Sequence, residues 1–271
     1  MTEDVTQLVQ AETEEWRTYD EFAAGIDTFR LPQADLTGTE LTVHLDGGPT
    51  LQLTFTGPAT VSWTSVGVLA TTGAAQDPCD AVAVRPDVTF VNLPLTSRER
   101  ESVTLVFSTT TRRVLAVHSV IAEHAQAGTP QVSQTFWAGT LDGADPTGPM
   151  PGPSRDLIGR RNLYRYSPEH LYEHVYISSQ RYAWQCLQGV QRGHGDMDLS
   201  TVWAFDDDLY LFCFREFKIA VASVWLHDLG PAMRTTGVFL GLTGAGEAEH
   251  SRAGGHVIPL GRVDYPDVQP V

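Results

Sequence analysis

Residues 40–57 read ELTVHLDGGPTLQLTFTG, and this stretch decides the fold class. Apolar residues alternate with other residues on both sides of Asp46-Gly47-Gly48, which is the period of two that a half-buried strand requires. An aspartate and two glycines between two such runs are typical of a tight hairpin turn. The stretch therefore predicts a pair of antiparallel strands.

Further short strand-like runs follow the hairpin, separated by glycine, proline and charged clusters. Many short strands without helices between them favour a barrel or a sandwich. In the first half these runs are Thr60–Val66, Asp80–Val84, Val88–Leu93, Val103–Ser108, Val114–Glu123 and Gln131–Leu141. In the second half they are Tyr172–Ser178, Tyr182–Leu187, Ser200–Phe205, Leu209–Arg215, Ile219–Leu226 and Thr235–Leu240. The two halves share an architecture by this interpretation, although no sequence repeat between them is evident.

The segment DGADPTGPMPGPSR at residues 142–155 is the clearest break in the chain, because its glycines and prolines sustain neither a helix nor a central strand. A helix is predicted near the N-terminus, over residues 5–24, where apolar residues recur at intervals of three and four. We therefore predict four parts. They are an N-terminal helical segment (1–35), a first barrel (36–141), a linker (142–165) and a second barrel (166–271).

Composition excludes several classes of partner. The 271 residues include 33 acidic and 18 basic side chains, for a net charge of −15. Such a surface repels phosphate backbones and anionic membranes, so we expect neither nucleic-acid nor membrane binding. No run of 18 apolar residues is present, and the N-terminal sequence MTEDVTQLVQAETEEW is acidic, unlike a signal peptide. We expect a cytoplasmic protein whose three cysteines are partly buried thiols, and self-association into a homo-oligomer stays open.

Aromatic residues occupy one face of several predicted strands in the second half. In a barrel every second residue points inward. These faces carry Tyr172, His174 and Tyr176; Tyr182, Trp184 and Cys186; and Tyr210, Phe212 and Phe214. Aromatic faces with a few polar groups are typical of a small-molecule cavity, but a filled barrel core has the same pattern. The sequence leaves both alternatives open.

Several segments resemble the MoaF family. YDEFAAGID and LTGTELTVHLDGG are similar to the opening of its N-terminal domain. The segments YEHVYISSQRYAWQCL, DLSTVWAFDDDLYLFCFREFKI and DLGPAMRTTGVFLGLTG resemble its C-terminal domain more specifically. The resemblance implies two tandem lipocalin-like, calycin-type barrels. Together with the helix predicted near the N-terminus, this gives a mainly β fold with a short N-terminal helix. The resemblance implies little about activity, because one fold hosts many functions.

Three residues are the predicted catalytic groups: Glu216, His174 and Tyr176. Glu216 and Lys218 share one face if FREFKI is a strand, and burial would suit Glu216 for acid–base work. A solvated turn with a surface ion pair is the alternative. His174 is an acid–base candidate near neutral pH, or else part of an aromatic core.

The predicted substrate-binding residues are mostly the aromatic ones. They are Trp184, Tyr182, Tyr210, Phe212, Phe214, Trp63, Trp137, Arg85 and Lys218. Arg85 can bind a substrate carboxylate if it points inward, whereas a surface turn is the alternative.

The sequence contains no dinucleotide-binding, Walker or serine-hydrolase motif and no clustered metal ligands, so we expect no cofactor and no metal. The leading hypothesis is a cofactor-free enzyme of lyase, isomerase or cyclase type, acting on an aromatic or apolar metabolite. A non-catalytic protein that binds a hydrophobic small molecule is the alternative, and a scaffold with two filled barrels is a third interpretation.

Overall fold

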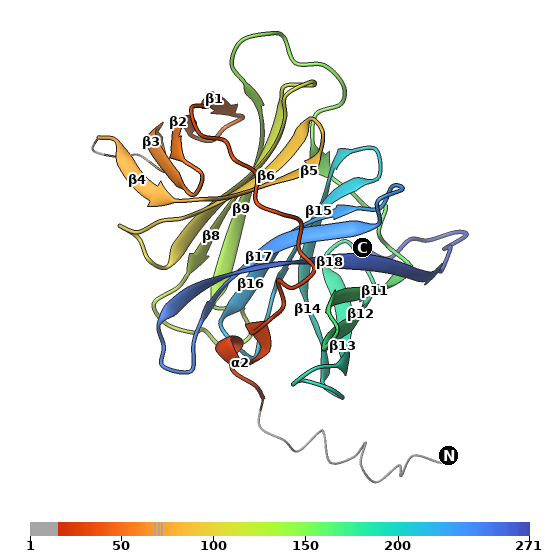
Figure 1. Cartoon of the computed structure of the whole chain (residues 1–271). Coiled ribbons are helices and arrows are strands. Elements are labelled where there is room, and N and C mark those ends of the chain that lie inside the picture. The colour runs from red at the N-terminus through yellow and green to blue at the C-terminus, as the bar shows by residue number, and fades with distance from the viewer. Residues whose placement is uncertain (1–15, 68, 70, 72) are drawn as a thin grey trace, which may run out of the picture.

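The computed structural model describes residues 16–271 except 68, 70 and 72. In this part the chain forms two nine-stranded antiparallel sheets, and each sheet curls into a barrel (Figure 1). The prediction of two tandem antiparallel barrels is confirmed. Among the described helices, none is long and apolar enough to cross a membrane.

The first barrel closes through one bent strand. β4 pairs with β3, β5 pairs with β6, and only Cys79 separates β4 from β5, so this segment joins the two edges of the sheet. The strands are β1 (Glu40–Leu45), β2 (Thr50–Gly57), β3 (Thr60–Val66), β4 (Ala75–Pro78), β5 (Asp80–Arg85), β6 (Val88–Pro94), β7 (Glu101–Ser108), β8 (Arg113–Ile121) and β9 (Val132–Leu141).

The second barrel closes through a single long strand, β14, which pairs with β13 on one side and β15 on the other. The short strand β10 adds to the outside of β14. The strands are β10 (Gly152–Pro153), β11 (Arg160–Ser167), β12 (His170–Tyr176), β13 (Arg181–Gln188), β14 (Gly195–Asp206), β15 (Leu209–Arg215), β16 (Val221–Asp228), β17 (Arg234–Leu242) and β18 (Ala248–Arg262).

The two barrels repeat one another, which the sequence does not reveal. A shift of 121 residues takes β6 (88–94) onto β15 (209–215) and β8 (113–121) onto β17 (234–242). In both barrels a glycine of the last strand passes close to the first strand. A Cβ at Gly139 would lie 2.2 Å from the carbonyl oxygen of His44, and a Cβ at Gly255 would lie 2.2 Å from that of Arg165. His44 and Arg165 are also 121 residues apart.

The N-terminal segment packs on the second barrel rather than on the first. Its helix α2 (Tyr19–Ala23) is shorter than the predicted helix over 5–24, of which residues 5–15 lie outside the described residues. The Thr18 N–H donates to Oε2 of Glu21 (2.9 Å) at the start of α2, and Gly25, with φ +81°, turns the chain away after it. The segment then runs along the second barrel and reaches the first barrel at Arg30, which bonds Asp80, and at Ala34 (Figure 1).

Residues 160–165, which the prediction placed in the linker, form most of β11. This strand pairs with β12 and β18 and is an integral part of the second barrel. Three arginines in the run RRNLYRYS obscured its alternation, although Asn162, Tyr164 and Tyr166 all point to the buried side.

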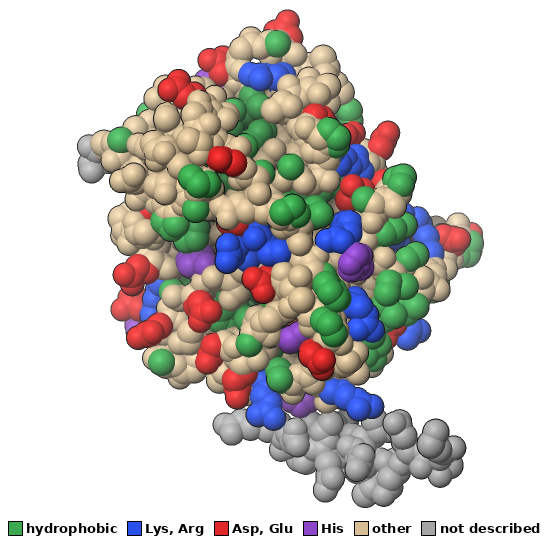
Figure 2. All heavy atoms as spheres, in the orientation of Figure 1, with side chains coloured by type: hydrophobic (Ala, Val, Ile, Leu, Met, Phe, Trp, Pro, Cys, Tyr) green, Lys and Arg blue, Asp and Glu red, His purple; other side chains and the backbone are tan. Residues whose placement is uncertain are grey.

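An apolar interface joins the barrels. The outer faces of β6–β8 and β15–β17 pack together, so these strands are buried on both sides. This cluster comprises Val88, Phe90, Val106, Leu115, Val117, Phe205, Leu209, Leu211, Cys213, Val224, Leu226 and Val238. Figure 2 shows acidic side chains scattered over one face of the molecule, with basic side chains in a band across its middle.

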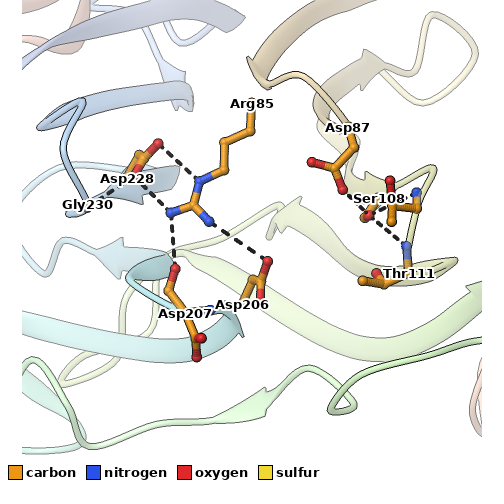
Figure 3. Close-up of polar contacts among 9 residues, drawn as sticks. Arg85, Asp87, Ser108, Thr111, Asp206, Asp207, Asp228 and Gly230 are labelled. Atoms are coloured by element: carbon orange, nitrogen blue, oxygen red, sulfur yellow. Dashed lines mark hydrogen bonds and ion pairs between the residues drawn. The ribbon is translucent and has the colours of Figure 1, made fainter.

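At the rim of this interface, Arg85 of the first barrel forms a two-point ion pair with Asp228 of the second (Figure 3). Its Nε and Nη2 lie 3.2 and 2.9 Å from the two carboxylate oxygens, and Nη2 also donates to the carbonyl oxygen of Asp207 (3.0 Å). Arg85 thus holds the barrels in register and does not reach a ligand cavity. In the adjacent turn, Ser108 Oγ donates to Asp87 at 2.7 Å.

We expect Leu211→Ala to lower the free energy of unfolding by about 2–5 kcal/mol, because it opens a cavity in the interface between the barrels. Urea denaturation measures the change. Val66→Ala, on a side chain that is 75% exposed, is the control and should change stability by less than about 0.5 kcal/mol. Equal effects of the two substitutions would contradict a contribution of this interface to stability.

Candidate functional site

The interior of the second barrel contains a small cavity at the end covered by α2. Its volume is about 30 Å³, which is room for one or two water molecules. The lining is aromatic apart from a few residues, and it includes a carboxylic acid and a histidine. The lining residues are Phe22, Ile26, Tyr166, Tyr172, His174, Tyr182, Trp184, Gln191, Phe214, Glu216, Trp225 and Phe239.

Glu216 is the most unusual group in this lining. It is 5% exposed, and no described residue donates a hydrogen bond to its carboxyl group or forms an ion pair with it. Burial, and then the nearby carboxylates of Asp198 and Asp196, raise the pKa of Glu216 well above its usual range. The shift favours the neutral carboxylic acid, which can donate a proton as well as accept one.

Lys218 does not neutralise Glu216. Strand β15 ends at Arg215, so the shared strand face predicted for these two residues does not form. Residues 216–220 make a turn in which Glu216 faces inward and Lys218 is half exposed. The Lys218 ammonium pairs with Asp196 (3.0 Å) and lies 3.8 Å from the centre of the Trp16 ring.

Asp198 is a second buried carboxyl group beside Glu216. The Trp184 indole N–H donates to its Oδ2 (2.8 Å), and the backbone N–H of Phe217 donates to its Oδ1 (3.3 Å). Burial nevertheless raises the pKa of Asp198 to about 6. Because Phe217 follows Glu216 in the chain, this bond also fixes the turn that presents Glu216 to the cavity.

His174 lies in the same lining and is packed among rings. Its ring centre is 4.4 Å from that of Tyr164 and 5.1 Å from that of Tyr182, and its Nδ1 has no partner among the described residues. Burial lowers the pKa of His174 to about 3, so the imidazole is neutral at neutral pH. In this state it can accept a proton only if a ligand or a water compensates the charge.

Tyr176, the third predicted catalytic residue, lies away from the cavity. Its hydroxyl group is 2.5 Å from that of Tyr164 and 3.2 Å from Nε2 of His227, whose Nδ1 is 2.8 Å from Thr235 Oγ1. These groups satisfy one another in a buried chain deeper in the barrel. The structure thus brings Glu216 and His174 to one cavity and leaves Tyr176 outside its lining.

The N-terminal segment closes the cavity. Phe22 and Ile26 form part of the lining, and Trp16 stacks on His194 with ring centres 5.1 Å apart. The edge of Trp16 also contacts Trp184, at 5.9 Å between ring centres. A hydrogen bond from the Gly244 N–H to Oδ1 of Asp20 (2.9 Å) ties the segment to the turn between β17 and β18.

The first barrel provides an internal comparison for this site. The Trp63 indole N–H donates to Oδ2 of Asp77 (2.8 Å), and the Thr96 N–H donates to Oδ1 of Asp77 (2.8 Å). In the second barrel Trp184 and Phe217 donate to Asp198 in the same way. In both barrels the aspartate follows the tryptophan by 14 residues and precedes the second donor by 19. The residue before Thr96 is Leu95, which therefore corresponds to Glu216. The two barrels thus share the hydrogen bonds from a tryptophan and a backbone N–H to an aspartate. They differ at the residue just before that backbone N–H, which is Leu95 in the first barrel and Glu216 in the second.

Other lining positions differ in the same way. Pairing and the spacing of 121 residues match Leu53 with His174 and Val61 with Tyr182. Pairing with Val91 and Phe212, which are 121 residues apart, matches Leu105 with Trp225. The first barrel has a core of mostly aliphatic side chains at these positions, whereas the second has rings and polar atoms. The second barrel is consequently the candidate site.

The remaining predicted residues are divided between the site and its surroundings. Tyr182, Trp184 and Phe214 line the cavity, and Phe212 supports it from behind with its ring 5.0 Å from that of Tyr182. Tyr210 is at the other end of the barrel, in a surface hollow beside Asp206, Asp207 and Asp208.

Two predicted residues lie in the first barrel, far from this cavity. Trp63 is buried in the core, and Trp137 is half buried beside His118, with ring centres 6.5 Å apart. Like Arg85, which bonds Asp228, they do not join the site.

Sequence reasoning missed several members of the lining. Tyr166 was assigned to the expected second barrel but to no strand, and Trp225 and Phe239 lie in predicted strands without being singled out. The alternation of Ser223, Trp225 and His227 on β16 was a usable signal. No comparable signal identifies Phe22 and Ile26, because only folding brings the N-terminal segment to this barrel.

Among the residues that the structure describes, no group of three or more histidine, cysteine, aspartate or glutamate side chains is arranged to hold a metal ion.

Comparison with known proteins assigns the family. The family model described as "MoaF N-terminal domain" matches residues 14–123, and that described as "MoaF C-terminal domain" matches residues 151–263. Protein MoaF from Klebsiella aerogenes is 35% identical over 219 residues, which cover 77% of this chain and 79% of that protein. The chain belongs to the MoaF family. Both MoaF domains are present in this order, and the candidate cavity lies in the C-terminal one.

The solved structures that align with this MoaF protein are only weakly similar to it. A putative β-lactamase from Burkholderia vietnamiensis aligns with 38% of this chain and 95% of its own, at 14% identity and a TM-score of 0.33. The β chain of DNA polymerase III from Streptococcus pneumoniae aligns with 97% of this chain and 64% of its own, at 9% identity and a TM-score of 0.12.

We expect Glu216→Gln to gain stability relative to the wild type as the pH rises from 4 to 8. The pKa of Glu216 is raised in the folded protein, so the folded state binds more protons than the unfolded state above about pH 4.3. The free energy of unfolding of the wild type therefore falls with rising pH until the folded pKa is reached, and glutamine removes this contribution.

Urea denaturation at pH 4 and pH 8 tests this expectation. The stability of the variant minus that of the wild type should increase by at least about 1.4 kcal/mol, which corresponds to one pKa unit. Glu123→Gln, on an exposed side chain, is the control and should show no such increase. If the stability of Glu216→Gln minus that of the wild type is the same at pH 4 and pH 8, a raised pKa of Glu216 in the folded protein is contradicted.

Proposed function

We propose that the second barrel binds a small aromatic or apolar molecule and that Glu216 transfers protons to and from it. One observation carries this proposal: a buried carboxyl group without a hydrogen bond or ion pair among the described residues, in an aromatic cavity. Burying such a group costs several kcal/mol unless something compensates it. Groups with strongly shifted pKa values in cavities are frequent at functional sites.

The chemistry that these residues support is cofactor-free acid–base catalysis of lyase, isomerase or cyclase type. The neutral Glu216 acid donates its proton to a basic atom of the bound molecule. The resulting carboxylate then removes a proton from another position of the same molecule, so that atoms and charges balance without a further reactant. The rings hold the substrate in one orientation, which lowers the barrier further.

Ligand entry requires the N-terminal segment to move. A cavity of about 30 Å³ is far smaller than the roughly 300–1,000 Å³ of pockets that hold drug-sized ligands. Phe22 and Ile26 fill the space between the cavity and the barrel end. Their displacement would enlarge the cavity without any change in the barrel strands.

A non-catalytic binding role is the second candidate. It is favoured by Tyr176, whose hydroxyl group is engaged with Tyr164 and His227, and by the low pKa of His174. In this case Glu216 only forms a hydrogen bond to an unchanged ligand. Cytoplasmic residence and the absence of nucleic-acid binding remain predictions from the sequence, and self-association into a homo-oligomer stays open.

We expect Phe22→Ala to raise the association rate of N-phenyl-1-naphthylamine, a neutral fluorescent probe, by at least about threefold. The substitution removes a ring from the cover of the cavity. Stopped-flow fluorescence measures the rate. Phe29→Ala, in the same segment but outside the lining, is the control and should leave the rate unchanged. Equal rates for the two variants would contradict entry beneath this segment.

We expect Glu216→Gln to lower turnover by at least about 100-fold, the usual size of a general acid–base contribution, while ligand affinity changes little. The ligand is first identified by mass spectrometry of the untreated protein and by a screen of aromatic metabolites, and its conversion is then followed by chromatography. Tyr176→Phe is the matched control and should retain most of the activity. Turnover by a variant that combines Glu216→Gln, His174→Ala and Tyr176→Phe would refute these roles. A ligand that the wild type binds without converting it would favour the non-catalytic alternative.

A further inference from the structure

We propose that the ligand of the second barrel is an uncharged planar aromatic molecule with an oxygen atom that accepts hydrogen bonds. This inference rests on the proposed function, in that it assumes that the barrel binds a small molecule.

The first observation is an unpaired donor on the lining residue Trp225. Its side chain is 1% exposed, and its indole Nε1 has no hydrogen-bond partner among the described residues. An indole N–H can only donate a hydrogen bond, and leaving a buried donor unpaired costs about 1–3 kcal/mol. Trp184, the other indole of the lining, is already satisfied by Asp198. A ligand with an acceptor atom would compensate Trp225.

The second observation is that Glu216 adds another donor to the same lining. Burial favours the neutral form of its carboxyl group, and a neutral carboxyl group presents an O–H. In the matched positions of the first barrel, Leu95 and Leu105 present neither an N–H nor an O–H. The two donors therefore distinguish the second barrel from its filled counterpart, and both call for an acceptor on the ligand.

The third observation concerns the walls of the cavity. Tyr166 stacks on Trp225 with ring centres 5.0 Å apart and planes 22° apart, and Phe239 meets Trp225 edge-on at 5.4 Å and 88°. Walls of stacked and perpendicular rings are complementary to a flat ring, which gains offset-stacked and edge contacts. A flexible aliphatic chain would gain fewer of these contacts.

The fourth observation is the balance of charge. The described lining contains no lysine or arginine, and His174 is neutral because burial lowers its pKa to about 3. A carboxylate or phosphate ligand would thus be buried without a cation, close to Asp198. An ammonium ligand would need Glu216 to lose its proton against the burial that retains it. An uncharged ligand avoids both costs.

A titration with four probes of similar size tests this inference on the full chain at pH 7, by ligand-observed NMR. The probes are acetophenone, ethylbenzene, benzylamine and benzoate. We expect acetophenone to bind at least about threefold more tightly than ethylbenzene, which lacks the acceptor, and both charged probes to bind more weakly than acetophenone. Tightest binding of benzylamine or benzoate would overturn the inference.

Trp225→Phe tests the assigned donor directly. We expect it to weaken acetophenone about three- to tenfold, the usual effect of one hydrogen bond, and to leave ethylbenzene unchanged. Trp203→Phe, on the outer side of β14 and stacked on Phe136, is the control. Equal weakening of acetophenone and ethylbenzene by Trp225→Phe would overturn the role of the N–H. Failure of all four probes to bind would instead refute the proposed function.

Discussion

The structure depends on the burial of both faces of three strands in each barrel. The inner faces of β6–β8 and β15–β17 form barrel cores, and their outer faces form the apolar interface between the barrels. A strand that is apolar on both faces cannot be exposed to water without loss of the hydrophobic stabilisation that folds it. The two MoaF domains are therefore held together as one unit. Hydrophobic burial alone does not fix how the two surfaces are oriented, and the ion pair between Arg85 and Asp228 helps to fix it.

The interface uses the outer faces of the strands, so the ends of the two barrels lie outside it and can carry different residues. One end of the second barrel receives the N-terminal segment, whose Phe22 and Ile26 complete the core and enclose Glu216. A carboxyl group in this position weakens the barrel, while the matched Leu95 strengthens the first. Natural proteins retain such local costs mainly where function requires them, and this is the physical reason for assigning the site to the second barrel.

Much of the fold could be predicted, and about half of the candidate site. Alternation over residues 40–57 and the later runs indicated the strands, because a period of two follows from strand geometry itself. Tyr182, Trp184, Phe214, His174 and Glu216 were found in the same way and share the cavity. Most of β11 was assigned to the linker because its outward side chains are arginines, which hide the alternation. Tyr176 was assigned to the site because alternation shows which face of a strand a residue is on, but not how far along the barrel axis it lies.

The sequence by itself determined the strand pattern, the family and the inward direction of the aromatic residues, because these depend on local geometry and on residue type. Only the tertiary structure decided which barrel contains the cavity, that Lys218 turns outward to Asp196, and that Arg85 bonds the other barrel. It alone revealed that the barrels repeat at a spacing of 121 residues, with Leu95 in the place of Glu216. Contacts between residues far apart in the chain set these features, and no periodicity along the sequence encodes which distant residues meet.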